Sequence, residues 1–219
     1  MTETALEYAL YWSFRSPYSY LVTPRLAALQ QEYDVACAVR IVYPIAVRQA
    51  AFFANNDPLW LPYFMRDVFR SAEFVGLPLR WPRPDPVVMD FATRSYPKEQ
   101  PLVIRLSKLG QLAAEWGKGL AFIDEISRLI WSGTIDDWDK GDHLAAATER
   151  AGLSLAEMDA VVTAESERLH AAIETNQAAQ REGGHYGVPL MVFNGEPFFG
   201  QDRFDQLKWR MEQAGLARR

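Results

Sequence analysis

Sequence typical of β-strands occurs only near the two ends of this chain, and this distribution constrains the fold most strongly. Residues 7–13 are apolar and aromatic and predict a buried strand. Ser16-Pro17 then predicts a helix start, with serine as the N-cap and proline in the first turn. The β-branched segment 35–43 predicts a second strand. A strand, a helix and a strand in so short a stretch form a βαβ unit with parallel strands.

Strand-like sequence returns close to the C-terminus. Residues 189–193 are apolar, and the Asn194-Gly195 pair that follows is the strongest short signal for a hairpin turn. Residues 196–199 are again strand-like, and an amphipathic helix follows Gly200. The chain therefore predicts a four-stranded sheet of mixed direction with helices packed on it.

The long section between the two strand regions has only helical and loop character. Six of the 13 prolines lie in residues 78–101, which excludes regular structure throughout that stretch. Helices are predicted over residues 61–76, 102–116, 119–131 and 139–151, and from a capping box at Ser154 to Gly183. The fold class is therefore α/β, with a large all-helical insertion between a βαβ half and a ββα half.

Composition excludes several classes of function. The chain has 23 basic and 28 acidic residues, a net charge of −5, and so lacks the basic face that nucleic acids require. Its one cysteine, Cys37, excludes an internal disulfide and is expected to be an inert buried thiol. Three scattered histidines lack the spacing of metal ligands. We find no sequence typical of a signal peptide or membrane span, and expect a cytoplasmic protein in a reducing compartment.

The first candidate site is Ser16, at the start of the first predicted helix. A Cys-x-x-Cys pair at such a position has thiols activated by the helix N-terminus, but here the two positions are Ser16 and Ser19. A serine pair cannot form a disulfide, so a reactive thiol would have to come from a bound molecule. Ser16 as a simple N-cap is an alternative, and the two roles are compatible because a hydroxyl accepts and donates.

Two further motifs have ordinary structural interpretations when taken alone. Pro189, in Gly187-Val188-Pro189, is allowed as the first residue of a strand. In the segment 199–203, an acid in a first helical turn is usually a favourable partner of the helix dipole.

Taken together, the motifs closely resemble the 2-hydroxychromene-2-carboxylate isomerase family, which is grouped with kappa-class glutathione transferases and DsbA-type oxidoreductases. The resemblance covers almost the whole chain and implies a thioredoxin-like domain of residues 1–45 and 185–219, with an inserted helical domain of residues 46–184. The segments that carry it are FRSPYSY at 14–20, Tyr63, Arg66-Asp67, Gly76-Leu77-Pro78, the Trp131 segment, GVP at 187–189 and NGEPFFGQDRFDQL at 194–207.

The resemblance also implies glutathione as the cofactor, with its sulfur against the Ser16 hydroxyl. Val188, before a proline that is cis in the family, would pair with the cysteinyl part of glutathione. Gln201 and Asp202 would hold the γ-glutamyl end, assisted by Arg203. The resemblance further implies a small-molecule substrate and a homodimer.

This sequence departs from the family pattern at two places. Ser13 occupies a position where the family usually has an aspartate. The loop Asn56-Asp57-Pro58-Leu59 matches an Asn-x-Pro-Pro motif only in part, and the family's following lysine is missing. Asn56 is expected to keep the asparagine's role toward the substrate, and the Trp131 segment is a second candidate for substrate contact.

The expected function is a glutathione-dependent isomerase acting on an aromatic or conjugated 2-oxo acid through transient thiolate addition. Two alternatives are a kappa-like glutathione transferase, which would stop at the thioether, and a non-catalytic thioredoxin-fold protein that binds a thiol or a partner.

Overall fold

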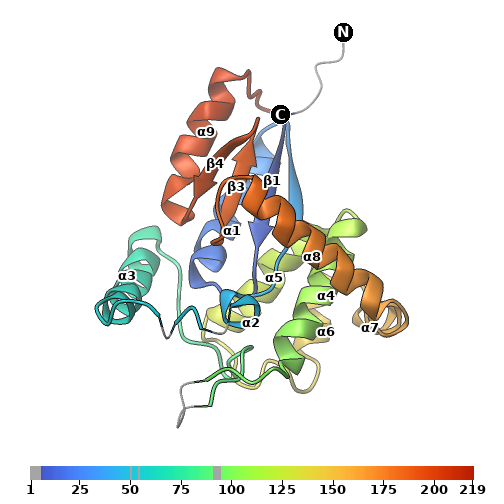
Figure 1. Cartoon of the computed structure of the whole chain (residues 1–219). Coiled ribbons are helices and arrows are strands. Elements are labelled where there is room, and N and C mark those ends of the chain that lie inside the picture. Colours follow the sequence, from blue (N-terminus) through green and yellow to red (C-terminus); the bar gives the residue numbers. More distant parts are fainter. Residues whose placement is uncertain (1–5, 50, 54, 91–94) are drawn as a thin grey trace.

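The computed structural model describes residues 6–49, 51–53, 55–90 and 95–219 (Figure 1). In chain order, the elements are β1 (Leu6–Trp12), α1 (Pro17–Glu32), β2 (Val35–Ile41), α2 (Ile45–Arg48), α3 (Trp60–Val75), α4 (Pro101–Glu115), α5 (Gly119–Trp131), α6 (His143–Arg150), α7 (Leu155–Ala164), α8 (Ser166–Glu182), β3 (Leu190–Phe193), β4 (Glu196–Phe199), the 3-10 turn η1 (Gln201–Arg203) and α9 (Phe204–Gln213).

The four strands form one sheet in the order β2-β1-β3-β4. β1 and β2 are parallel, with Leu6 opposite Val35 and Trp12 opposite Ile41. β3 is antiparallel to both β1 and β4. The βαβ unit, the hairpin and the mixed sheet predicted from the sequence are therefore confirmed.

The helices of the insertion also lie close to their predicted positions, with three differences. The helix predicted from Ser154 to Gly183 is divided into α7 and α8 at Glu165, whose backbone is not helical, with φ of −117° and ψ of 26°. α6 begins at His143 rather than at residue 139, because Asp137 and Gly141 have left-handed backbones, with φ of 54° and 55°. A right-handed helix cannot pass through residues in that conformation. The single-turn helix α2 (Ile45–Arg48) was not predicted, because four residues are too few to show helical periodicity.

Both serine caps predicted from the sequence are present. The Oγ of Ser16 accepts the amide hydrogen of Ser19, and the Oγ of Ser154 accepts that of Glu157. Each side chain thus satisfies one of the amide groups that a helix leaves unpaired at its start.

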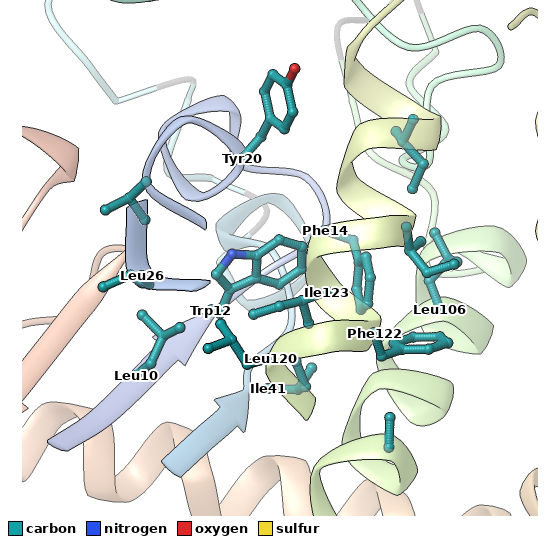
Figure 2. Packing of buried hydrophobic residues seen from close by; sticks show 14 of the residues in the cluster. Leu10, Trp12, Phe14, Tyr20, Leu26, Ile41, Leu106, Leu120, Phe122 and Ile123 are labelled. Atoms are coloured by element: carbon teal, nitrogen blue, oxygen red, sulfur yellow. The ribbon is translucent and has the colours of Figure 1, made fainter. Parts of the chain in front are cut away.

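The core is built around the C-terminal end of β1 (Figure 2). The rings of Trp12 and Phe14 meet edge to face at 4.7 Å, and Phe14 meets Phe122 of α5 in the same way at 6.3 Å. Gly110 lets α4 approach, since a Cβ there would lie 2.8 Å from the Phe14 ring. One hydrophobic cluster therefore runs from the sheet into the insertion, while the division into two domains stays a prediction.

α1 contacts elements from separate parts of the chain, among them α3, α5 and η1 (Figure 1). α5 packs along α1, and α9 lies beside β3 and β4. α3 lies apart from the other insertion helices and is joined to α1 by a hydrogen bond from the Tyr18 hydroxyl to Asp67, at 2.6 Å. Among the described residues, no helix is long and apolar enough to cross a membrane.

Candidate active site

Ser16 is half-buried at the N-terminus of α1, where the chain leaves β1. Its Oγ accepts a hydrogen bond from the amide of Ser19 at 3.2 Å. The same hydroxyl donates to the backbone carbonyl of Val188 at 3.4 Å. α1 is 16 residues long and has no acidic residue in its first turn. The partial positive charge at its N-terminus is therefore available to an anion beside Ser16.

The other serines of this segment and the single cysteine are not available for chemistry. Ser19 is fully buried, and its carbonyl accepts hydrogen bonds from Trp12 and Thr23. Ser13 is 1% exposed, and its buried hydroxyl has no partner among the described residues. Cys37 was expected to be buried, but as a residue it is half-buried. Its thiol is nevertheless enclosed, and this raises the pKa of the thiol to about 12, so it stays protonated at neutral pH. A thiolate beside the first helix would have to be supplied by a bound molecule.

The three sequence motifs come together at the start of α1. The Val188–Pro189 peptide bond is cis. The Pro189 carbonyl accepts the amide hydrogen of Gly200 at 2.9 Å, which joins the second motif to the third. Arg25 of α1 donates to the carbonyl of Gln201 at 3.2 Å, which joins the third motif to the first helix.

The turn η1 presents two charged side chains near this junction. Asp202 and Arg203 are exposed and form an ion pair at 3.0 Å, whereas Gln201 is 9% exposed. Gly200 has a φ of 102°, and a Cβ there would lie 2.6 Å from Oδ1 of Asp202. Glycine therefore permits both the turn and the position of the carboxylate.

A network that the sequence did not reveal fixes the segment before the cis-proline. The ring of His185 stacks on Phe199 at 3.7 Å, and its Nδ1 accepts the amide hydrogen of Gly187 at 2.9 Å. The carbonyl of Gly187 accepts from Gln180 at 2.7 Å, and Gln180 is held in turn by Arg48. Burial lowers the pKa of His185, so the ring is neutral and able to accept at neutral pH.

A continuous series of half-buried aromatic rings also begins next to Ser16 and was not predicted. Tyr18 contacts Phe64 at 5.7 Å, and Phe64 stacks on Trp60 at 5.0 Å. Trp60 contacts Phe53 at 5.7 Å, which contacts Tyr96 at 5.5 Å. Two signals were present in the sequence, the density of aromatic residues from 52 to 64 and the tryptophan at 60.

The two residues predicted to contact substrate have different surroundings. Asn56 lies between Phe53 and Trp60 along the chain, and its Nδ2 is buried with no partner among the described residues. Such an unpaired donor is usually satisfied by a ligand or water. Trp131 is fully buried, and its indole N–H donates to the carbonyl of Phe14 at 3.0 Å. Trp131 supports the segment before Ser16 and has no exposed surface for a substrate, so the substrate contact expected of Trp131 is not supported.

Arg15, immediately before Ser16, is the charged group that sequence reasoning missed. It forms a two-bond ion pair with Asp85, at 2.5 and 2.6 Å, and its guanidinium lies 4.4 Å from the Trp81 ring centroid. Asp85 is 70 positions away in the proline-rich stretch, so no local pattern could have indicated the pair.

Two cavities, of about 490 and about 300 Å³, are lined by none of the predicted site residues. The larger lies between the edge strand β2 and the turn joining α4 to α5, and the smaller between α2 and α8. No group of histidine, cysteine, aspartate and glutamate side chains within the described ranges has the arrangement of a metal site.

Known proteins similar to this chain agree with the motifs. A curated 2-hydroxychromene-2-carboxylate isomerase from Pseudomonas putida is 26% identical over 211 residues, covering 92% of each chain. A solved structure of 2-hydroxychromene-2-carboxylate isomerase superposes with a TM-score of 0.70 at 22% identity, covering 95% of this chain and 96% of that one. The cytosolic disulfide reductase DsbM from Pseudomonas aeruginosa gives a TM-score of 0.60 at 16% identity, covering 95% and 98%.

The resemblance seen in the motifs is confirmed by these relatives, and the thioredoxin-like fold with a helical insertion by the solved structures. The model of the DSBA-like thioredoxin domain matches residues 9–212, which is nearly the whole chain. The protein therefore belongs to the family of DSBA-like thioredoxin domains.

Proposed function

We propose that this protein is a glutathione-dependent isomerase acting on an aromatic or otherwise conjugated 2-oxo acid. The observation that supports this most is the hydroxyl of Ser16, placed at a helix N-terminus and against Val188, in a chain whose only thiol is protonated. The similar protein from Pseudomonas putida is named an isomerase, which favours isomerisation over other thiol chemistry.

The residues around Ser16 fit the parts of glutathione. The bond from Ser16 to the Val188 carbonyl is long, at 3.4 Å, so the hydroxyl hydrogen can turn to a sulfur atom at little cost. The backbone of Val188 would pair with the cysteinyl residue. The exposed carboxylate of Asp202 suits an ammonium group, with Arg203 and Gln201 beside it for the α-carboxylate.

When bound, glutathione would supply a thiolate that adds reversibly to the conjugated double bond, allowing rotation before elimination restores the alkene. The chain's part is to hold negative charge on sulfur. The Ser16 hydroxyl donates to the charged form, and the N-terminus of α1 favours the same form electrostatically. Both effects lower the pKa of a bound thiol, and neither requires the serine to attack the substrate.

The substrate side of the site is formed by the aromatic series from Tyr18 to Tyr96. Flat, half-buried rings suit a planar conjugated molecule, and few polar groups are needed to orient it. The unpaired Nδ2 of Asn56 provides one such polar group within this segment. We include in the proposal a homodimer working in a reducing compartment, where glutathione is abundant.

Calorimetry with glutathione, followed by product analysis, tests this function. Glutathione should bind, and 2-hydroxychromene-2-carboxylate should be converted to an isomer of unchanged mass only when glutathione is present. A thioether product would indicate a kappa-like transferase instead. Binding without turnover of any conjugated 2-oxo acid would indicate a non-catalytic protein, and no binding at all would refute the proposal.

A further inference from the structure

The guanidinium of Arg15 is held rigidly at the edge of the candidate active site. Its Nε and Nη2 donate to the two oxygens of Asp85 at 2.5 and 2.6 Å. The Cζ of Arg15 lies over the Trp81 ring, 4.4 Å from its centroid, and 5.9 Å from the centroid of the Trp131 ring. A cation fixed by a two-bond pair and aromatic stacking loses little further freedom when it binds an anion.

Asp85 is fully occupied in holding Arg15 and its own loop. Besides the two bonds from Arg15, its oxygens accept the indole N–H of Trp81 at 3.1 Å and the amide of Val87 at 3.0 Å. A carboxylate with four donors has no capacity left for a ligand. Asp85 therefore orients the cation and does not itself bind substrate.

The opposite edge of the guanidinium is uncommitted. The pair with Asp85 uses Nε and one hydrogen of Nη2, which leaves Nη1 and the outer hydrogen of Nη2. Among the described residues, Arg15 has no other hydrogen-bond acceptor, and its side chain is 20% exposed. This edge has the paired donor geometry that binds a carboxylate through two parallel bonds.

The position of Arg15 assigns it to the substrate side of the site. Among the described residues, the hydrogen bonds and ring contacts of its side chain lie in the stretch from Trp81 to Asp85 and at Trp131, and none lies in the segment 185–203 proposed for glutathione. The charge of Arg15 also acts on Tyr96, the last ring of the aromatic series. The cation thus lies within electrostatic range of the series of rings that begins at Tyr18.

We propose that Arg15 is a specificity-determining residue, whose free edge binds the carboxylate of the conjugated acid substrate. This inference rests on the proposed function, because it concerns the acceptor side of the same site. The chain should consequently select acids over their uncharged analogues.

The test compares two nearly isosteric probes that already have the more stable trans geometry, trans-cinnamate and trans-cinnamamide, by calorimetry on the protein with glutathione present. The wild type should bind cinnamate about tenfold or more tightly than cinnamamide, as expected for hydrogen bonds to a charged group. Arg15→Gln should remove this preference, and Arg15→Lys should restore part of it.

Arg105 offers a matched control. It forms the same two-bond pair, with Asp159 at 2.9 and 2.6 Å, but between α4 and α7. Arg105→Gln should therefore leave the preference for cinnamate intact. If the wild type binds both probes equally, or if Arg15→Gln keeps the preference, the inference is wrong.

The carboxylate could instead belong to glutathione, and the same variants distinguish the two sources. Glutathione affinity, measured without probes, should be unchanged in Arg15→Gln. A loss of glutathione affinity with an unchanged preference for cinnamate would place a glutathione carboxylate at Arg15 and overturn the inference. If the wild type does not bind glutathione, the proposed function is refuted. The preference for cinnamate is then measured on the free protein, so the inference about Arg15 is tested separately.

Discussion

The hydroxyl of Ser16 donates to the backbone carbonyl of Val188 across 3.4 Å, although the two residues lie 172 positions apart. The contact joins the N-terminus of α1 to the residue before the cis-proline, next to the β1–β3 pairing that connects the two halves of the fold. A long hydrogen bond between a hydroxyl and a half-buried carbonyl is easily exchanged for one to a ligand. This junction is therefore where we expect a thiol to bind.

Ser16→Ala should abolish most of the isomerase turnover, because it removes the donor to sulfur. It should also lower the free energy of unfolding by about 1 kcal/mol, since Ser16 is an N-cap. Ser154→Ala separates the two effects, because Ser154 caps α7 in the same way and touches no site residue. Turnover is measured by kinetics and the free energy of unfolding by urea denaturation for both variants. Equal losses of turnover in the two would mean that Ser16 acts only on stability.

Asp202→Asn should weaken glutathione binding while leaving turnover at saturating glutathione nearly unchanged. The substitution keeps the shape of an exposed side chain but removes the charge proposed to face the ammonium group. Asp205→Asn is the control, because Asp205 is also exposed and its ion pair is with Arg25. Steady-state kinetics with varied glutathione should show a raised KM for the first variant only. A change confined to kcat would contradict this placement of the γ-glutamyl end.

Glutathione affinity should fall as the pH drops through the folded-state pKa of His185, which lies below 6.5. Burial lowers the pKa of His185 from its ordinary value of 6.5. The stabilising effect of the neutral ring is complete above pH 6.5 and is lost as the pH falls from there toward the folded-state pKa. Protonation removes the acceptor for the Gly187 amide, one residue before Val188.

Calorimetry across pH 5 to 8 should show this fall in the wild type and a flatter profile in His185→Gln. His143→Gln, at an exposed position on α6, should behave as the wild type does. A profile that is the same in His185→Gln and the wild type would exclude a role for this ring.

Trp131→Phe should destabilise the protein by about 1–3 kcal/mol, because the carbonyl of Phe14 would lose its buried partner and the smaller ring would leave a cavity. Trp209→Phe, at a side chain that is 51% exposed, should change stability by less than about 0.5 kcal/mol. Chemical denaturation of both variants measures the difference. Similar values for the two would show that the Trp131 hydrogen bond does not fix the segment before Ser16.

Local patterns predicted most of the fold and the centre of the site. Short apolar and β-branched runs located the four strands of the described residues, and helical patterns located most of the longer helices. The serine-proline pair located the cap at Ser16. The site features that escaped are contacts between distant segments. Asp85 meets Arg15 from a proline-rich stretch without regular structure, and His185 stacks on Phe199 of β4. Neither pairing has a spacing that a sequence pattern could reveal, because tertiary packing alone brings the partners together.

The pKa of the sulfur of bound glutathione tests the central claim most directly. It can be measured from the ultraviolet absorbance of the thiolate in the complex, in the wild type and in Ser16→Ala. We predict a value well below the ordinary thiol pKa of about 8.5 in the wild type, and a return toward that value in the variant. A bound sulfur that titrates at its ordinary pKa in the wild type, or identically in both proteins, would contradict the account.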